Sequence, residues 1–292
     1  MFRADLMTGA RVLVTGGGTG LGRIMATALA GLGARIYICG RRSAVLDETA
    51  AAINALYGPG RCVGWVCDLR DTDSIEALLS RIWADGGALT GLVNNAAANF
   101  ISRAEDVSAK GFNAIAEPVM RGTFLITTGC GRRWIAAGQP GAVVSILTTW
   151  VWSGGPFAAP AAMAKAGLHV MTQSLAVEWG QRGIRLNAVC PGAFPTEGMT
   201  ARLLPTGMGV TTEANNPMRR NGRPEELANL ITFLLAPGSE FITGQTLAID
   251  GAGHQAGSAS FAHLAHWTDA QWSAARDATR AATVGDKNAR AP

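Results

Sequence analysis

The stretch TGGGTGLG follows a short apolar run and opens an Ala/Leu-rich stretch. Glycine permits a tight turn and a close backbone approach to a ligand, and the free N–H groups at a helix N-terminus bind anions. A glycine-rich turn between a strand and a helix is typical of dinucleotide-binding α/β proteins. The turn therefore predicts a cofactor pyrophosphate site made of Thr15, Gly16, Thr19, Gly20, Leu21 and Gly22.

Seven short runs alternate with helical stretches, and most of the runs are apolar throughout, as parallel strands covered on both faces should be. The runs are Arg11–Val14, Arg35–Cys39, Val63–Val66, Gly91–Val93, Ala142–Ile146, Arg185–Val189 and Thr246–Ile249. We therefore expect an α/β fold with a Rossmann-type, doubly wound, seven-stranded parallel sheet. Pro118 lies inside the helical stretch Ser108–Ala137 and predicts a kink or a break there.

The chain length indicates one domain, and the Gly/Ser-rich link and amphipathic segment that begin near residue 254 indicate an extension. We expect residues 1–254 to form the domain, with a mobile substrate lid around residues 193–220. Residues 255–292 are expected to be an amphipathic and partly flexible extension. Its apolar residues could pack on the body or on a neighbouring subunit; they are Phe261, Leu264, Trp267 and Trp272.

Composition narrows the class of ligand. Hydrophobic residues make up 48% of the chain and charged residues 16%, which indicates a folded core. The net charge is only +4 and the basic residues are scattered or paired, which argues against a nucleic-acid surface and favours a small anionic ligand. No apolar run reaches membrane-spanning length and no signal peptide is evident, so we expect a cytoplasmic protein. The five cysteines and four histidines show no metal-binding spacing, so no metal is expected.

The end of the second strand indicates which dinucleotide binds. It reads IYICGRR and supplies Arg41 and Arg42 where an acidic residue would bind the ribose hydroxyls of NAD. Because a guanidinium suits a phosphate monoester, we predict NADP(H), the alternative being a solvated arginine pair. Further cofactor residues are expected after the third and fourth strands. They are Asp68 and Leu69 beside the adenine, and Asn95, Ala96 and Ala97 near the rest of the cofactor.

Taken together, these motifs resemble the short-chain dehydrogenase/reductase family over about residues 7–254. The resemblance is supported further by Ser145, Lys165, Pro191-Gly192 and the segment Ile242–Gly253. Within the family the chain is most similar to 2,4-dienoyl-CoA reductases, on NNAAANFIS (Asn94–Ser102) and SLAVEWGQRGIRLNAVCPG (Ser174–Gly192). The resemblance implies NADPH-dependent reduction of an activated C=C bond in an acyl thioester, in a homotetramer or homodimer. It also implies cofactor contacts by Lys165, Pro191, Gly192, Phe194 and Thr196.

The chain departs from this family pattern where the chemistry is expected. The family's tyrosine four residues before the lysine is Ala161 here, a position that is serine in dienoyl-CoA reductases. Their second tyrosine, on the segment after the fifth strand, corresponds to Trp150. A serine two residues before the lysine becomes Met163, and the family's helix asparagine becomes Arg121. Neither Tyr37 nor Tyr57 is placed to substitute.

Four residues remain as catalytic candidates. Lys165 is expected to bind the nicotinamide ribose and to bring positive charge, although cofactor binding could be its whole role. Ser145 ends a buried strand and is either a ligand for a substrate oxygen or a structural hydroxyl. Trp150 could donate its indole N–H to an enolate oxygen or form pocket wall. Arg121 could bind a carboxylate or thioester oxygen, or pair with Glu117 at i and i+4.

The expected pocket combines polar and aromatic residues, which suggests a flat or conjugated substrate. Its predicted lining is Asn99, Phe100, Thr148, Thr149, Trp152 and Phe157. An NADPH-dependent reductase of a conjugated double bond is the leading hypothesis, since an enolate needs hydrogen-bond donors more than an immediate proton. Reduction of an imine or iminium, and a catalytically silent NADP-binding protein, are the alternatives. Ala161 disfavours an ordinary ketoreductase, which needs a proton donor.

Overall fold

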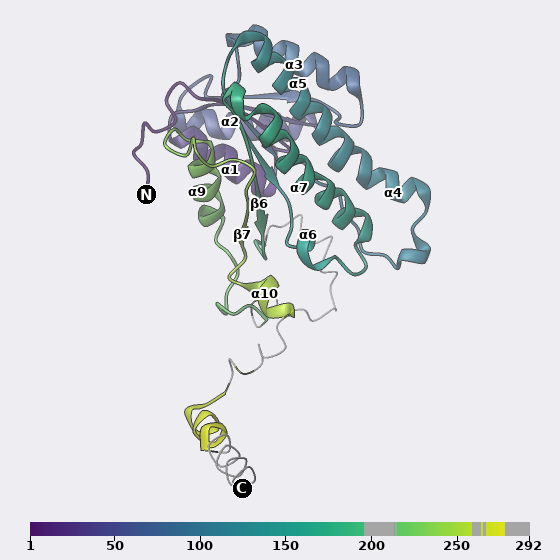
Figure 1. The fold of residues 1–292 in the computed structure, drawn as a ribbon. Helices are drawn as coiled ribbons and strands as arrows, with labels where there is room; N and C mark the ends of the chain where they lie inside the picture. The colour runs from purple at the N-terminus through teal and green to yellow at the C-terminus, as the bar shows by residue number, and fades with distance from the viewer. Residues whose placement is uncertain (196–212, 214, 259–263, 265–266, 278–292) are drawn as a thin grey trace.

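Seven parallel strands form one sheet in the order β3-β2-β1-β4-β5-β6-β7 (Figure 1). The computed structural model describes residues 1–195, 213, 215–258, 264 and 267–277. Each predicted strand lies within one observed strand, so the doubly wound sheet is confirmed. The strands are β1 (Arg11–Thr15), β2 (Arg35–Gly40), β3 (Cys62–Val66), β4 (Gly91–Asn94), β5 (Gly141–Ile146), β6 (Ile184–Pro191) and β7 (Thr246–Ile249).

The strand order reverses between β1 and β4, which pair in parallel although two strands separate them in the sequence. In an open α/β sheet, the crevice at such a switch point lies outside the carboxyl ends of the strands. The glycine-rich turn follows β1, and the Asn95–Ala97 segment follows β4. The topology therefore brings both predicted cofactor segments to the same edge of the sheet.

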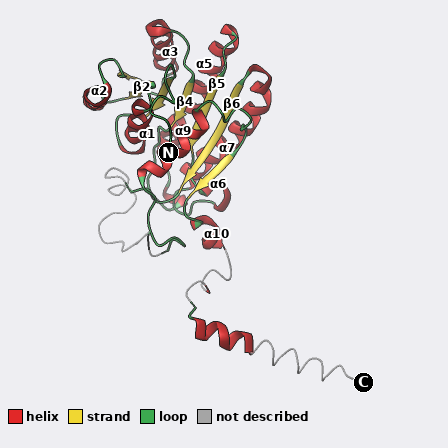
Figure 2. Ribbon diagram, turned by 90° about the vertical axis from the view of Figure 1, so that its left-hand side faces the viewer, coloured by secondary structure: helices red, strands yellow, loops and turns green. Residues whose placement is uncertain are grey.

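Helices cover both faces of the sheet, as Figure 2 shows. One core contains buried side chains of α1 (Gly20–Gly31), α2 (Ser43–Tyr57) and α9 (Pro224–Leu235). The other contains those of α3 (Thr72–Gly86), α5 (Gly122–Ala137) and α7 (Ala159–Trp179). The sheet residues are buried between these layers, which explains why most of the strands are apolar along their whole length.

Short helical segments connect the longer ones. They are η1 (Ala104–Asp106), α4 (Ala109–Ala116), η2 (Glu117–Arg121), α6 (Trp150–Ser153), η3 (Gly180–Arg182) and α10 (Gly253–Ser258). The break predicted at Pro118 is present as the π-helical turn η2 between α4 and α5. Proline lacks an N–H and cannot continue the regular α-helical hydrogen bonds, so a local widening of the helix accommodates it.

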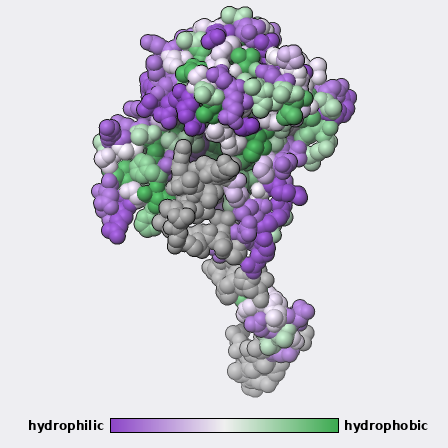
Figure 3. Space-filling model, turned by 180° about the vertical axis from the view of Figure 1, so that it is seen from behind, coloured by the Kyte–Doolittle hydropathy of each residue, from purple (hydrophilic) through white to green (hydrophobic). Residues whose placement is uncertain are grey.

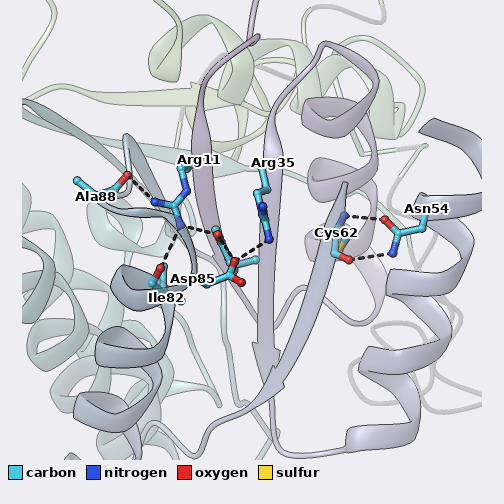
Figure 4. Close-up of polar contacts among 8 residues, drawn as sticks. Arg11, Arg35, Asn54, Cys62, Ile82, Asp85 and Ala88 are labelled. Carbon is cyan, nitrogen blue, oxygen red and sulfur yellow. Dashed lines mark hydrogen bonds and ion pairs between the residues drawn. The ribbon is translucent and has the colours of Figure 1, made fainter. Parts of the chain in front are cut away.

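A polar cluster fastens α3 to the sheet near the amino ends of β1 and β2 (Figure 4). Arg11 donates to the carbonyl of Ile82 at 3.0 Å, and Arg35 pairs with Asp85 at 2.7 Å. The fully buried Tyr37 accepts a hydrogen bond from Arg11 and donates to Asp85 at 2.7 Å. The Tyr37 phenol is thus bound within the polar cluster that ties α3 to the sheet.

Parts of the predicted lid and extension lie outside the described residues, namely 196–212, 214, 259–263, 265–266 and 278–292. Phe261 is among them. In the described part of the extension, the rings of Trp267 and Trp272 meet edge to face with centroids 5.1 Å apart.

Hydrophilic and hydrophobic residues are interspersed over the face seen from behind (Figure 3). Among the helices that can be described, none is both long enough and apolar enough to cross a membrane.

Candidate functional site

A groove of about 750 Å³ runs along the carboxyl ends of β1 to β4. Most of the predicted cofactor residues line it. They are Gly16, Thr19, Leu21, Gly22, Arg41, Arg42, Asp68, Leu69, Asn95, Ala96 and Ala97. The structure therefore brings together segments that the sequence places up to 80 residues apart, Thr15 and Asn95 being hydrogen-bonded across the switch point.

The turn after β1 requires glycine for reasons of space and backbone conformation. A Cβ on Gly22 would lie 2.4 Å from the carbonyl oxygen of Gly16 and 2.5 Å from the Asn95 amide nitrogen. A Cβ on Gly17 would lie 2.5 Å from the side chain of Ile38, and Gly16 and Gly20 have φ angles of 64° and 53°. Since Thr19 makes no side-chain cap and the first turn of α1 holds no acidic residue, the helix N-terminus can receive an anion.

Thr15 and Asn95 hold this turn against β4 rather than facing a ligand together. The Thr15 hydroxyl accepts from the backbone N–H groups of Asn95 and Ala96, both at 3.0 Å. The Asn95 side chain donates to the Thr15 carbonyl at 2.9 Å. Thr15 is fully buried, and neither it nor Gly20 lines the groove. Thr15 is thus a positioning residue for the predicted pyrophosphate site.

Three arginines line the groove, of which sequence reasoning identified Arg41 and Arg42 but missed Arg70. Arg70 binds the Asp68 carboxylate through its Nε at 3.0 Å and its Nη2 at 2.6 Å. This hydrogen bond is the main reason why the pKa of Asp68 is lowered. The sequence signal for this contact was an arginine two residues after Asp68. The groove surface suits an anionic ligand.

Lys165 is held by α7 above the carboxyl end of β5. Its ammonium donates to the carbonyl of Ile146, the last residue of that strand. The side chain is 8% exposed, and burial lowers its pKa to about 8, which the neighbouring Cys190 thiol partly opposes. A buried ammonium near the carboxyl ends of the strands can place a weakly screened positive charge there. The contact with a nicotinamide ribose stays a prediction.

Ser145 belongs to a buried polar trio at the ends of β4 and β5. Its hydroxyl accepts from the Asn94 side chain at 3.3 Å, and Asn94 also donates to Thr127 at 2.9 Å. Ser145 is 1% exposed. These contacts match the structural alternative for this hydroxyl, and substrate binding by Ser145 stays a prediction.

The Arg121 side chain contacts the segment at the start of α3. Its guanidinium donates to the Arg70 carbonyl and to the Thr72 hydroxyl, both at 3.0 Å. Both terminal nitrogens are therefore engaged by the connection between β3 and α3 rather than by Glu117. The reason is that Arg121 ends the π-helical turn η2, from which its side chain reaches the start of α3. Arg121 supports a groove residue, Arg70, and no contact of its side chain supports the predicted substrate binding.

The predicted aromatic wall comes from α6 and the loop that follows it. Trp150 packs on the core and against Gly155, where a Cβ would lie 2.9 Å from the indole ring. The Trp152 ring stacks on His254 with centroids 4.8 Å apart, and the side chain is 44% exposed. Thr148 and Thr149 directly precede α6, and their carbonyls accept the N–H groups of residues 151 and 152.

A backbone hydrogen bond joins this wall to the loop after β4. The N–H of Ser102 donates to the Phe157 carbonyl at 2.9 Å, so the segment with Asn99 and Phe100 lies beside the segment that follows α6. Phe157 is exposed and has a φ of 61°. The Asn99 side-chain oxygen is buried, and no hydrogen-bond partner for it is found in the described part of the chain. Since such an acceptor costs about 1–3 kcal/mol, a ligand donor would fit there.

Sequence reasoning missed a carboxylate–imidazole pair after β7. The Asp250 carboxylate accepts from His254 Nδ1 at 2.7 Å and from its backbone N–H at 2.9 Å. A Cβ on Gly192 would lie 2.7 Å from the Asp250 Cβ, so the pair adjoins the end of β6. The signal was an Asp and a His four residues apart, directly after the last predicted strand. The stack on Trp152 brings this pair to the aromatic wall.

The remaining predicted cofactor residues are separate from the groove. Phe194 lines a second cavity of about 260 Å³ and packs on Gly222. Pro191 and Gly192 end β6 and begin the next loop, where the Gly192 N–H donates to the Ile249 carbonyl at 3.0 Å. Neither of them lines the groove. Thr196 lies outside the described residues.

The described residues contain no group of three or more His, Cys, Asp or Glu side chains that could hold a metal ion. Tyr57 lies at the end of α2 against Gly31, and Tyr37 is enclosed in the polar cluster near the amino ends of β1 and β2. Ala161 is 5% exposed and belongs to the core beneath α7. Both tyrosines of the chain therefore lie away from Lys165.

Comparison with known proteins gives one family for most of the chain. Residues 7–254 match the family model described as enoyl-(acyl carrier protein) reductase. A probable 2,4-dienoyl-CoA reductase of Caenorhabditis elegans, named as (3E)-enoyl-CoA-producing, is 37% identical over 98% of this chain and 94% of its own length. A probable 2,4-dienoyl-CoA reductase of Bacillus subtilis, named as (2E)-enoyl-CoA-producing, is 35% identical over 82% of this chain and 94% of its own length.

Solved structures agree with this result. A short chain dehydrogenase from Bacillus anthracis superposes with a TM-score of 0.76 at 37% identity, over 84% of this chain and 96% of that one. The actinorhodin polyketide ketoreductase, solved with NADPH, superposes with a TM-score of 0.78 at 27% identity, over 86% of this chain and 99% of that one.

Proposed function

Because this chain belongs to the short-chain dehydrogenase/reductase family and is therefore an oxidoreductase, we propose that it reduces a conjugated C=C bond with NADPH. The substrate class is a 2,4-dienoyl-CoA or a related enoyl thioester or enone. One observation carries the proposal. The glycine-rich turn after β1, together with Arg41 and Arg42, lies on the same sheet edge as the buried Lys165 and the aromatic wall.

The residues of the groove fit NADP(H). A Cβ on Gly17 or Gly22 would collide with atoms of the turn and its neighbours, so glycine at both positions lets the turn close tightly, as a pyrophosphate-binding turn requires. Arg41 and Arg42, at the end of β2, would bind the 2′-phosphate of the adenosine ribose, and Arg70 adds a third cation. When bound, NADPH supplies a hydride.

The part of the site along β5 to β7, with Lys165 and the aromatic wall, is suited to an electrophile whose reduction does not need an adjacent phenol. Adding a hydride at C5 of a 2,4-dienoyl thioester would spread the negative charge over C2, C4 and the thioester oxygen. Such an anion is stabilised by hydrogen-bond donors and by positive charge. Lys165 supplies the charge near the carboxyl ends of the strands, and the Trp150 indole N–H supplies a donor. A simple ketone would need a proton at its oxygen and would lose about 10²–10⁴-fold in rate without a donor.

We further propose that Asp250 and His254 deliver the proton that completes the reduction. They form a hydrogen-bonded acid–base pair that reaches the aromatic wall through Trp152. A proton added at C2 yields a 3-enoyl thioester, and a proton added at C4 yields a 2-enoyl thioester. The names of the two relatives record both products, and the position of this pair decides between them.

An assay of NADPH oxidation against dienoyl-CoAs, enoyl-CoAs, cyclic enones and cyclic imines tests the proposal. We expect turnover of a dienoyl-CoA and identify the product isomer by NMR. Turnover of imines alone would favour an imine reductase. Tight NADPH binding without turnover of any compound would favour a silent binding protein.

The role of the indole is tested by Trp150→Phe, which keeps the ring and removes the donor. We expect kcat to fall about 10²-fold, as when a single oxyanion donor is removed. Trp272→Phe, in the described part of the extension, is the matched control. An unchanged kcat in Trp150→Phe would remove the indole from the mechanism.

Association with further copies of the chain is also proposed. Hydrophobic side chains are exposed on the outer faces of α5 and α7, including Phe124, Val170 and Val177. Burying this surface against a second copy would remove it from water. Light scattering on the purified chain is expected to give a dimer or tetramer, and Val177→Glu is expected to shift the mass towards the monomer.

A further inference from the structure

Two cysteines lie side by side where the adenosine half of the groove begins. Cys39 is near the end of β2 and Cys67 directly follows β3, its neighbour in the sheet. Both line the groove, and each is only 1% exposed. Backbone hydrogen bonds connect them to the cofactor segments. The Gly16 N–H donates to the Cys39 carbonyl at 2.8 Å, and the Cys67 N–H donates to the Gly40 carbonyl at 2.9 Å.

The two thiols are chemically unequal. The Cys39 S–H donates a hydrogen bond to the Cys67 sulfur, which lowers the pKa of Cys67 and raises that of Cys39. The Ser74 hydroxyl adds a second hydrogen bond to Cys67 and further lowers its pKa. A thiolate is the nucleophile in oxidation by a peroxide, and a neighbouring thiol resolves the product. Cys67 is therefore placed to react first and Cys39 to react second.

We propose that Cys39 and Cys67 are an oxidation site for peroxides, which forms a disulfide when the groove is empty and is protected when a dinucleotide is bound. The Cys67 thiolate attacks the O–O bond of a hydroperoxide, giving a sulfenic acid and releasing an alcohol, or water from hydrogen peroxide. The Cys39 thiol then displaces the sulfenic hydroxyl as water. The peroxide is reduced, two thiols are oxidised and the S–S bond forms.

The disulfide would alter the dinucleotide site because of what the two cysteines hold. Closing the bond draws the sulfur atoms from hydrogen-bond contact to about 2.05 Å. The backbone hydrogen bonds of Cys39 and Cys67 transmit this movement to Gly16 and Gly40, which line the groove. We expect the Kd of the oxidised chain for NADP⁺ to rise about tenfold, and to return to its starting value after reduction with dithiothreitol.

The test counts thiols in the full-length chain. Reduced protein is treated with hydrogen peroxide, with and without saturating NADP⁺, then denatured and alkylated. The chain has five cysteines, so we expect three alkylated thiols and a Cys39–Cys67 cross-linked peptide without NADP⁺. With NADP⁺ we expect five alkylated thiols. Hydrogen peroxide is the probe because it is the smallest peroxide and both thiols are only 1% exposed.

Variants separate the two roles. Cys39→Ser is expected to stop at a sulfenic acid on Cys67, which dimedone traps, and Cys67→Ser is expected to remove the reaction. Cys62→Ser is the matched control, because Cys62 is buried on β3, its pKa is raised to about 12 by burial, and Asn54 binds its backbone at 2.8 and 2.9 Å (Figure 4). Circular dichroism establishes that each variant is folded.

Five alkylated thiols in the peroxide-treated chain without NADP⁺, or a disulfide between other cysteines, would overturn the proposal. A disulfide that forms equally fast with bound NADP⁺ would overturn the protection. The reaction without dinucleotide needs no turnover, so its outcome is independent of the proposed reductase activity. If NADP⁺ fails to bind the reduced chain, the proposed function fails and the claimed protection fails with it, while the thiol count still tests the dithiol.

Discussion

The two halves of the sheet edge differ in what defines their function. Along β1 to β4, the groove is defined by backbone: glycines that leave no room for a Cβ, a helix N-terminus and a turn braced by Thr15. Along β5 to β7, the site is defined by side chains, among them Lys165, Trp150 and the Asp250–His254 pair. Backbone requirements tolerate little change, whereas side chains can be exchanged for other chemistry. The first half should therefore be sensitive to any added side-chain atom in the turn, and the second half to the identity of single side chains.

The largest effect is expected from Gly22→Ala, which tests whether the first half depends on backbone space. The added methyl would lie 2.4 Å from the Gly16 carbonyl oxygen, so the turn has to move. We expect the Kd for NADPH, measured by nucleotide fluorescence, to rise at least about 100-fold. Gly180→Ala is the control, since a Cβ there meets no atom within 4 Å. Unimpaired binding by a folded Gly22→Ala chain would contradict the comparison.

Arg41→Ala, alone and with Arg42→Ala, tests whether side chains of the first half select the dinucleotide. Loss of a charge-assisted contact with the 2′-phosphate should weaken NADPH binding about tenfold to a hundredfold. NADH lacks that phosphate, so its Kd should change less than about twofold. Arg182→Ala, in the exposed η3 turn before β6, is the control. An equal loss for both nucleotides would show that the arginines act on the fold instead.

Ala161→Tyr tests whether the second half is an ordinary reductase site with one residue missing. Ala161 is buried in the core, so a phenol ring there must displace its neighbours. We expect the free energy of unfolding to fall by about 1–3 kcal/mol, measured by urea denaturation, with no gain in ketone reduction. A stable variant that reduces ketones would show that the lack of a phenol at this position alone prevents ketone reduction.

Lys165→Met tests the burial of charge in the second half, and its expected effect is the smallest when it is taken per pH unit. The pKa of Lys165 is lowered from 10.5 to about 8, so between these values the unfolded chain binds more protons than the folded chain. Stability of the parent chain should therefore rise with pH from about 8 to 10.5, relative to the variant, by at most about 1.4 kcal/mol per pH unit. Urea unfolding without nucleotide measures the difference. Parallel pH profiles would show that the ammonium is solvated.

The fold and the groove were predictable because their signals are local. Apolar runs predicted all seven strands, Pro118 predicted the break that is present as the π-helical turn, and the glycines predicted the turn that lines the groove. The second half was harder because its contacts join distant segments. Arg121 was predicted either to bind a substrate oxygen or to pair with Glu117, and its contacts with Arg70 and Thr72 depend on segments about 50 residues away. Asp250 and His254 were visible as a pair, but their meeting with Trp152 depends on the tertiary fold.

The stack of Trp152 on His254 constrains which substitutions this sequence can accept during evolution. Two rings far apart in the chain share one face, and His254 is in turn fixed by Asp250. Replacing either ring leaves the other exposed on the face that it lost. We therefore expect the two positions to covary among close relatives, as a single inherited unit that links the α6 wall to the start of the C-terminal extension.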